Sequence, residues 1–368
     1  MGGPRKNPNR LRSANASIRD VAQRAGVSIA TVSRVVNGIS TVAPELAERV
    51  WNVIREVGYV PNTQARALVS GRSRMLGLVV SEITNPFFPE LVKSFEDMAV
   101  RNGYEVIVAN TGYSPERTEV CVQRMLERKV DGVAVMTSEM GSHLIDRFHR
   151  GQIPMVFLDT GDPANGISNI LIDYTAGVDD AVEHITSLGH TRIAFISGPM
   201  ELASARTRRQ ALLASLKRKG LASSKSLIEI GNHRIDGGRA AMERLLTLEE
   251  RPTAVIASND LTAIGAIGAL HRHNLRVPED VSVVGFDDIE ISAFLHPALT
   301  TVRLSRAAIA DRAFQALHRA GKREAGPIPA VEYRIRPELI VRNSTAPPPA
   351  KRKGITLLKG AGEVPSQK

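Results

Sequence analysis

The chain has 368 residues, of which 43% are hydrophobic and 23% charged, and this length predicts two or three domains. The composition excludes a wholly disordered protein and a collagen-like one, and no apolar run reaches the ~18 residues that a membrane span needs. Cys121 is the only cysteine, so no internal disulfide is possible. The basic N-terminus lacks the apolar stretch of a secretory signal, so we expect a cytoplasmic protein.

The net charge of +10 is unevenly distributed along the chain. Residues 1–74 carry a net charge of +8, residues 75–346 a net charge of −2, and residues 347–368 a net charge of +4. A basic head on a near-neutral body favours a polyanion-binding module joined to a second domain. A basic end that only improves solubility is the alternative. We predict that residues 1–16 and 346–368 are disordered, because their charge is scattered and their apolar periodicity is weak.

The segment after residue 16 shows the pattern of three short helices. Ser17 precedes apolar residues at helical spacing and Asp20 follows three residues later, as in a capping box. Gly26 permits a tight turn before Ser28, which can cap the next helix. The helices that we predict run from Ser17 to Gly26, from Ser28 to Asn37–Gly38 and from Pro44 to Gly58. Two short helices around a glycine turn, supported by a third, form a helix-turn-helix.

The second predicted helix has one apolar side, formed by Val32, Val35 and Val36. The residues left facing outward are Ile29, Ala30, Thr31, Ser33, Arg34 and Asn37. Small side chains let the helix approach a groove wall, and the polar groups of Ser28, Thr31, Ser33 and Asn37 can donate to phosphates. Arg34 has the planar fork that suits the O6/N7 edge of guanine. The alternative is an ordinary three-helix bundle with a polar surface.

The segments RDVAQRAGVSIATVSRVVNG and YVPNTQARALVSGRS resemble the LacI/GalR family of bacterial transcription regulators. The resemblance implies paired hinge helices over residues 61–74 of a dimer, with Leu68 wedged into the DNA minor groove and Ala65 close behind it. A flexible tether is the alternative, because so short a helix is unstable alone. The complete set of expected DNA-binding residues is Ser28, Ile29, Ala30, Thr31, Ser33, Arg34, Asn37, Tyr59, Asn62, Ala65 and Leu68.

From residue 75 onward, apolar runs of strand length alternate with helical segments. This alternation predicts parallel sheets with helices on both faces. The predicted strands are 76–80, 105–110, 132–138, 155–159, 169–173, 192–198, 227–231, 254–260 and 281–288. The predicted helices are 87–102, 116–128, 174–188, 208–219, 236–247 and 261–273. The strands could form one large sheet or two smaller ones. The resemblance implies two, in a periplasmic-binding-protein-like pair of lobes, with the chain returning near 290–305 and 325–335.

Polar and aromatic residues directly after the strands predict a ligand site, because open α/β sheets bind ligands at the carboxyl ends of their strands. Aromatic faces together with Asp, Asn and Arg suit a polyhydroxyl ligand. The expected effector-binding residues are Asn85, Phe87, Phe88, Asp159, Arg208, Asn259 and Asp287. The resemblance places Arg208, Asp287, Asp159 and Asn259 at ligand-contacting positions of the family.

Each of these residues has a simpler alternative role. Asp287 and Asp288 could cap a turn, and either Asn259 or Asp260 could cap the next helix, with Asp260 the favoured cap. Arg206 could bridge to a surface carboxylate, and Phe87 and Phe88 could be core residues, although we expect one of them to touch ligand. The chain departs from the family pattern at Ala211, Ser305 and Arg312, which we expect to affect packing and the dimer surface.

The sequence gives little indication of catalysis or of a metal site. It contains no nucleophile elbow, phosphate-binding P-loop, HExxH motif or dinucleotide fingerprint. His271 and His273 are two residues apart near a predicted helix end, and we do not expect them to bind metal. Cys121 is expected to be packed in a helix. We therefore expect a protein that is not an enzyme and has neither a cofactor nor a metal.

These observations predict a helix-turn-helix domain over 17–60, a hinge over 61–74 and an effector-binding and dimerisation domain of two subdomains over 75–345. The predicted function is that of a nucleoid-associated homodimer that regulates transcription as a repressor, with a higher oligomer as the alternative assembly. It would bind a pseudopalindromic double-stranded operator under the control of a small effector, a sugar or sugar derivative. A cytoplasmic sugar-binding protein without a DNA-directed role is the first alternative, and a sugar-processing enzyme is the second.

Overall fold

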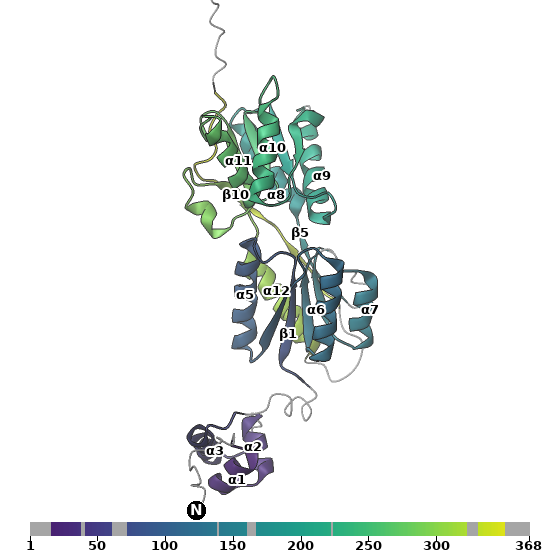
Figure 1. The fold of residues 1–368 in the computed structure, drawn as a ribbon, viewed down its shortest axis with the longest axis vertical. Coiled ribbons are helices and arrows are strands. Elements are labelled where there is room, and N and C mark those ends of the chain that lie inside the picture. Colours follow the sequence, from purple (N-terminus) through teal and green to yellow (C-terminus); the bar gives the residue numbers. More distant parts are fainter. Residues whose placement is uncertain are drawn as a thin grey trace, which may run out of the picture. The chain divides into compact units, whose positions relative to one another are not determined.

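The computed structural model describes residues 16–37, 41–60, 72–137, 140–159, 167–221, 224–321 and 330–349. The chain divides into a head and a body, and each is described by itself (Figure 1). The expected hinge residues Asn62, Ala65 and Leu68 lie outside the described residues. So do nearly all of the two segments that we expected to be disordered.

The head contains the three predicted helices, α1 (Ile18–Ala25), α2 (Ile29–Val36) and α3 (Pro44–Val57). The capping box at Ser17 is present: its backbone N–H donates to Asp20 Oδ2 at 2.7 Å, and its Oγ accepts from Asp20 N–H at 3.4 Å. Gly26 has φ +65°, a conformation that glycine adopts without steric cost, and this residue turns the chain toward α2. Small apolar side chains from all three helices, including Val21, Val32 and Val50, form the core of the head.

The body has two lobes, each built on a six-stranded sheet (Figure 1). The first lobe has the strand order β11-β5-β4-β3-β1-β2. Its strands are β1 (Met75–Val80), β2 (Glu105–Asn110), β3 (Gly132–Met136), β4 (Met155–Leu158), β5 (Ser168–Ile172) and β11 (Glu332–Ile335). Its helices are α5 (Phe87–Arg101), α6 (Pro115–Glu127), α7 (Ser142–Arg150) and α12 (Arg306–Gly321).

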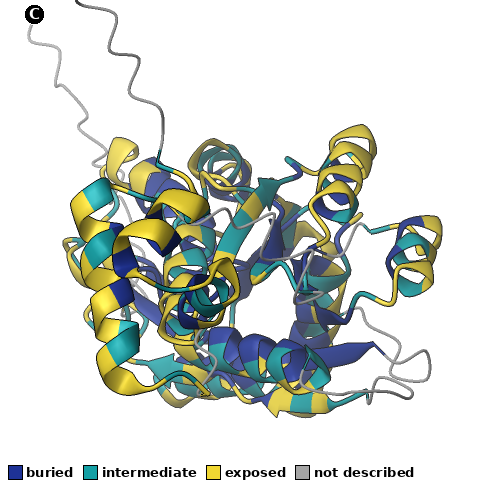
Figure 2. Ribbon diagram, turned by 90° about the horizontal axis from the view of Figure 1, so that it is seen from below, coloured by how far each residue is buried: buried dark blue, intermediate teal, exposed yellow. Residues whose placement is uncertain are grey.

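The second lobe has the strand order β12-β10-β9-β8-β6-β7. Its strands are β6 (Ile193–Ser197), β7 (Ile228–Ile230), β8 (Ala254–Ala257), β9 (Ser282–Asp287), β10 (Thr300–Arg303) and β12 (Glu338–Ile340). Its helices are α8 (Tyr174–Ser187), α9 (Ala203–Arg218), α10 (Ile235–Leu246) and α11 (Asp260–Arg272), with short 3-10 helices at Lys225–Leu227 and Glu290–Ala293. Figure 2 shows helices with buried residues on one side and exposed residues on the other.

The predicted α/β architecture is confirmed. The sequence pattern left open one large sheet or two smaller ones, and the structure has two. The pairings of the central strands are parallel, whereas β12 pairs antiparallel with β10. Every residue of the strands β3, β6 and β9 is buried, because helices cover both faces of each sheet. Within the described residues, the chain passes between the lobes after β5, after β10 and between β11 and β12.

Several boundaries differ from those expected. Helix α9 begins at Ala203, five residues before the predicted start at 208, and α7 was not predicted at all. The expected strand 254–260 ends at Ala257, because Asn259 already caps a helix. Ala346, which we placed in a disordered tail, accepts a 2.8 Å hydrogen bond from the buried imidazole of His190.

The three departures from the family pattern all have structural roles in the body. Ala211 is buried in the main core, and Ser305 Oγ accepts from the Ala308 N–H at 3.2 Å at the start of α12. The Arg312 guanidinium lies 5.3 Å from the centre of the Tyr333 ring. These positions therefore affect packing, as expected.

Candidate functional site

Helix α2 presents an exposed, mostly small surface. Ile29, Ala30 and Arg34 are exposed, whereas Val32 and Val35 are buried, and Val36 is half-buried. The Arg34 side chain makes no ion pair within the part of the chain that the structure describes. Its guanidinium is therefore available for an external partner.

The hydroxyl groups of α2 already have local partners. Ser28 Oγ accepts from the Thr31 N–H at 3.0 Å and lies 2.9 Å from Thr31 Oγ1. Ser33 Oγ accepts from Asn37 Nδ2 at 3.3 Å. Tyr59, also an expected DNA-binding residue, is half-buried and packs against the core of the head. These contacts fix the geometry of the polar surface, and a hydroxyl can still accept or donate a further bond.

All seven residues expected to bind effector line a single cavity of about 100 Å³ in the body. Both lobes contribute to it: Asn85, Phe87 and Phe88 follow β1 of the first lobe, whereas Arg208 comes from α9 of the second. The cavity combines aromatic walls with carboxylate, amide and guanidinium groups. This composition is the one that orients a small polar ligand between apolar surfaces.

Arg208 is the most constrained side chain of the cavity. Its guanidinium carbon lies 5.2 Å from the centre of the Tyr174 ring and 4.9 Å from that of Phe286. Its Nε donates to Ser204 O at 3.2 Å, and its Nη1 donates to Ser258 O. With the side chain only 6% exposed, these contacts hold the fork in a fixed orientation before any ligand arrives.

Asp287 ends β9 with φ +107° and is 7% exposed. Burial raises the pKa of this carboxyl to about 8, the charge of Asp260 adds to the increase, and Arg208 opposes it. Within the described ranges, the hydrogen bonds that Asp287 accepts go to its backbone carbonyl, and only burial and neighbouring charges act on its carboxyl. The Asp287 carboxyl is therefore a pre-positioned group to which a ligand can hydrogen-bond.

Asp159 follows β4, and both of its oxygens already accept hydrogen bonds. The Ile172 N–H donates to Oδ1 and the Tyr174 hydroxyl donates to Oδ2, each at 2.7 Å. Burial nevertheless raises the pKa of Asp159 to about 6, because the two hydrogen bonds and the charge of Arg208 offset only part of the desolvation. A ligand would meet this carboxyl already held in place.

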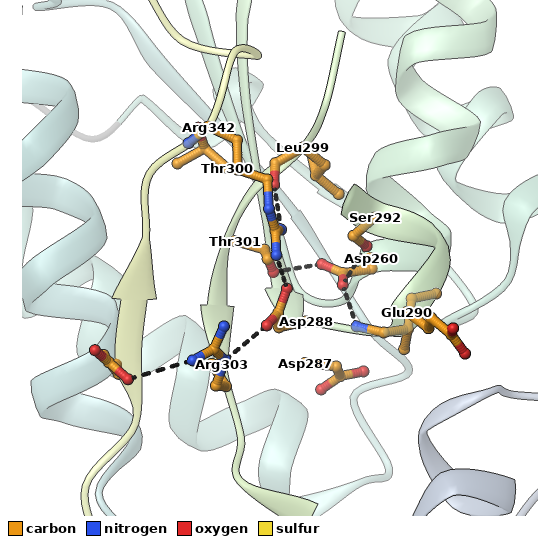
Figure 3. Close-up of polar contacts among 12 residues, drawn as sticks. Asp260, Asp287, Asp288, Glu290, Ser292, Leu299, Thr300, Thr301, Arg303 and Arg342 are labelled. Carbon is orange, nitrogen blue, oxygen red and sulfur yellow. Dashed lines mark hydrogen bonds and ion pairs between the residues drawn. The ribbon is translucent and has the colours of Figure 1, made fainter. Parts of the chain in front are cut away.

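Asn259, and not the favoured Asp260, caps the helix that follows β8. Asn259 is the cap of α11: its Oδ1 accepts from the Thr262 N–H at 2.9 Å, and its Nδ2 donates to His233 O at 3.0 Å. Asp260 is fully buried and accepts from Ile289 N–H, Ser292 Oγ and Thr301 Oγ1 (Figure 3). The expectation that Asp260 is the cap was wrong, because its carboxylate joins three segments of the second lobe instead.

Asp288 and Arg206 also differ from their simpler expected roles. Asp288 is ion-paired with Arg303 at 2.7 Å and with Arg342 at 2.6 Å, so it does not merely cap a turn (Figure 3). Arg206 donates to the backbone carbonyls of Met200 and Glu201 at 2.8 and 2.6 Å rather than to a surface carboxylate. Both side chains thus stabilise loops next to the cavity.

The loop after β1 is ordered by its own side chains. Asn85 Oδ1 accepts from the Phe87 N–H at 3.1 Å. Phe87 is 5% exposed and belongs to the core, whereas Phe88 is half-buried, and the two rings meet edge to face at 5.3 Å. Phe88 therefore offers more surface to a ligand than Phe87.

Among the further residues that line the cavity, three with polar rings were missed, namely Tyr113, Tyr174 and His233. His233 follows β7, so the rule of collecting residues after strands could have found it. Burial, together with the charge of Arg208, lowers the pKa of His233 to about 3, which keeps its imidazole neutral. Tyr174 begins α8 and is held by Asp159, a contact that chain order does not indicate.

No group of residues in the described segments could hold a metal ion, and His271 and His273 form no such cluster. Among the described residues, no helix is both long and apolar enough to cross a membrane. Cys121 is half-buried in α6, and burial raises the pKa of its thiol.

A helix-turn-helix head and a two-lobed body around a polar cavity define the class of bacterial regulators that combine these two folds in one chain. The family model "Bacterial regulatory proteins, lacI family" matches residues 17–62, and the model "Periplasmic binding protein-like domain" matches residues 182–345. Among curated proteins, the HTH-type transcriptional repressor PurR of Haemophilus influenzae is 36% identical over 332 residues, which cover 89% of this chain and 98% of the relative. PurR of Mannheimia succiniciproducens is 33% identical over 341 residues, with the same coverage. The chain belongs to the LacI family of bacterial regulatory proteins.

Solved structures agree with this assignment. The Lac repressor dimer bound to operator and the anti-inducer ONPF is similar with a TM-score of 0.79 and 28% identity, covering 90% of this chain and 99% of that one. The complex of the transcriptional regulator CelR with cellobiose is similar with a TM-score of 0.68 and 29% identity, covering 89% and 99%.

Proposed function

We propose that the protein is a dimeric transcriptional repressor that binds a specific operator through α2 and responds to a small polyhydroxyl effector in the cavity. The observation that carries this proposal is the presence, in one chain, of a helix-turn-helix with an exposed Arg34 and of a cavity with a pre-oriented Arg208. The names of the relatives support repression, because they are transcriptional repressors rather than enzymes. We propose the domain limits that the sequence predicts, with a hinge over residues 61–74.

The chemistry of the cavity supports the effector class. Arg208 offers a fixed donor fork, and the Asp287 carboxyl offers both acceptor and, when protonated, donor capacity. Vicinal hydroxyl groups can use both partners at once, while Phe88 covers the apolar face of a sugar ring. We therefore propose a sugar or a sugar derivative, bound between the two lobes.

An exposed apolar face supports the dimer. Ile291 and Phe294 are 51% and 71% exposed, and Ile291 borders a groove formed with Leu261, Ile264 and Leu295. Exposed apolar groups that gather on one surface usually mark an interface. We propose a second copy of the chain as the occupant, since a similar protein, the Lac repressor, was solved as a dimer. Phe294→Glu should convert the dimer to a monomer in analytical ultracentrifugation, whereas a monomeric wild type would contradict this assignment.

DNA recognition is tested by selecting binding sites from random DNA and then comparing the affinities of variants at fixed salt. Arg34→Ala should weaken binding to the selected site about 10- to 100-fold, because a bidentate base contact contributes about 1–3 kcal/mol of discrimination. Binding to unrelated DNA should change much less. Arg49→Ala, which removes an exposed arginine from α3, is the matched control.

If no sequence is enriched in the selection, the alternative of a sugar-binding protein without a DNA-directed role gains support. If a site is enriched and Arg34→Ala binds it as tightly as wild type, the assignment of α2 as the recognition helix is wrong.

A further inference from the structure

The turn after β9 connects the cavity to the first lobe. Asp287, whose side chain faces the cavity, and Asp288 have φ values of +107° and +55°, so two successive non-glycine residues adopt left-handed conformations. Such a turn persists only when its surroundings hold it in place. Within the second lobe, the Arg303 and Arg342 side chains hold Asp288 (Figure 3).

Two charged side chains of the first lobe hold the same turn from the other side. Arg306 of α12 forms an ion pair with Glu90 of α5 at 2.8 Å. The Arg306 Nη1 donates to Asp287 O at 2.7 Å, and the Glu90 Oε1 accepts from the Glu290 N–H at 3.1 Å. The Leu304 N–H also reaches Asp287 O, but at the longer distance of 3.4 Å.

These contacts make the Glu90–Arg306 pair a clamp on the backbone of the turn. One end of the pair holds the carbonyl of Asp287, and the other holds an amide three residues later. Hydrogen bonds in which the donor or the acceptor is charged are shorter and stronger than those between neutral groups. The side chains of Arg306 and Glu90 are also only 17% and 28% exposed, which limits competition from water. A displacement of Asp287 in the cavity must therefore move these helices of the first lobe or break the clamp.

We propose that Glu90 and Arg306 couple occupancy of the cavity to the relative orientation of the lobes. Both are positioning residues: neither lines the cavity, and both act through the backbone of Asp287 and Glu290. The identification of the cavity as an effector site rests on the proposed function, whereas the mechanical connection does not.

The first test measures hydrogen exchange of the Glu290 amide, resolved to single residues, in the full-length protein without DNA or sugar. Glu90→Ala should accelerate this exchange at least about tenfold, because a hydrogen bond to a charged acceptor is lost. Glu90→Gln, which keeps an acceptor oxygen, should rescue most of the protection. Unchanged exchange in Glu90→Ala would overturn the proposal.

The second test measures the distance between the lobes with spin labels at Glu119→Cys on α6 and Lys217→Cys on α9, both exposed, in a Cys121→Ser background. At a pH of about 9.5, above the pKa of about 8 of the wild-type carboxyl, Asp287→Asn replaces a charge near Arg208 with a neutral amide and should shift the distance distribution. In a Glu90→Ala or Arg306→Lys background the same substitution should produce no shift. A shift of equal size in both backgrounds, or no shift in either, would refute the coupling.

The matched control is the ion pair of Glu82 with Arg234 at 2.6 Å, which also joins the lobes but does not contact the turn. Glu82→Gln should leave the response to Asp287→Asn intact. Because the two measurements need neither operator nor sugar, a failure of the clamp is distinguishable from a failure of the proposed function. Thermal unfolding of each variant shows whether the chain is folded.

Discussion

The Tyr174 hydroxyl donates a 2.7 Å hydrogen bond to the Asp159 carboxylate, and this contact joins the two lobes. Asp159 follows β4 of the first lobe, whereas Tyr174 begins α8 of the second. Both residues line the cavity, and Tyr174 also forms one wall of the site that holds Arg208. A single hydroxyl therefore supports both the position of a carboxylate and a contact between the lobes.

Tyr174→Phe should raise the pKa of Asp159 above its value of about 6, because a hydrogen bond that favours the carboxylate is removed. At pH 8, where wild-type Asp159 is ionised, the free energy of unfolding should fall by about 1.5–3 kcal/mol. At pH 4 the carboxyl is protonated in both proteins, so the difference should be smaller. Urea unfolding at the two pH values measures this effect.

The control for this substitution is Tyr333→Phe, since the Tyr333 hydroxyl has no hydrogen-bond partner among the described residues. It should cost little stability at either pH. An equal loss in both variants would show that the effect comes from removing a buried hydroxyl rather than from the contact with Asp159.

Asp287 should make the body less stable as the pH rises. Its folded-state pKa is about 8, against an ordinary value of 3.8, so between these values the folded state binds a proton that the unfolded state lacks. The contribution of Asp287 to the free energy of unfolding is thus greatest at low pH and declines between pH 3.8 and about 8 by at most about 1.4 kcal/mol per pH unit. Asp287→Asn removes this dependence, so the variant should gain stability relative to wild type as the pH rises from 5 to 8.

Chemical denaturation in a series of buffers measures that gain. Asp97→Asn, which removes an exposed carboxylate paired with Lys93, controls for the loss of a negative charge. Parallel pH profiles of wild type and Asp287→Asn would contradict the prediction.

Arg208→Lys should abolish most sugar binding although it preserves the positive charge. Lysine cannot reproduce the planar fork that donates to Ser204 O and Ser258 O and lies beside the two aromatic rings. We expect at least about a tenfold loss of affinity, equivalent to about 1.4 kcal/mol. Calorimetry with the sugar that gives the largest thermal shift in a screen measures the loss.

The matched control is Arg206→Lys on the same helix, because Arg206 does not line the cavity. It should bind the same sugar with wild-type affinity. Equal losses in both variants would indicate a disturbed helix instead of a lost contact.

Trp51 is the only tryptophan of the chain and lies in α3, so its fluorescence should follow the unfolding of the head. Ser17→Ala removes the capping box of α1, and we expect a loss of about 1 kcal/mol in the unfolding of the head, followed by fluorescence. Gln23→Ala, an exposed substitution on the same helix, should be neutral or slightly stabilising. Identical unfolding midpoints for Ser17→Ala and Gln23→Ala would show that the cap contributes nothing.

The sequence alone determined the features that depend on near neighbours in the chain. The Ser17–Asp20 capping box, the left-handed turns at Gly26 and Gly58 and the alternation of strands with helices all follow from spacing, because their partners lie a few residues away. The seven expected cavity residues were collected from the segments that follow strands, and the family resemblance singled out four of them; all seven line one cavity. Their roles in effector binding remain a prediction.

The tertiary structure alone decided which of several similar side chains has which role. Asp260, Asp287 and Asp288 look alike in the sequence but differ in their surroundings. Hydroxyl and backbone groups satisfy the Asp260 carboxyl, two arginines hold that of Asp288, and that of Asp287 is influenced by burial and nearby charges. The contact of Glu90 with Glu290 joins residues 200 positions apart, and no local pattern indicates it. The physical reason is that the protonation and orientation of a buried charge depend on every group that folding brings around it, and most of those groups come from distant segments.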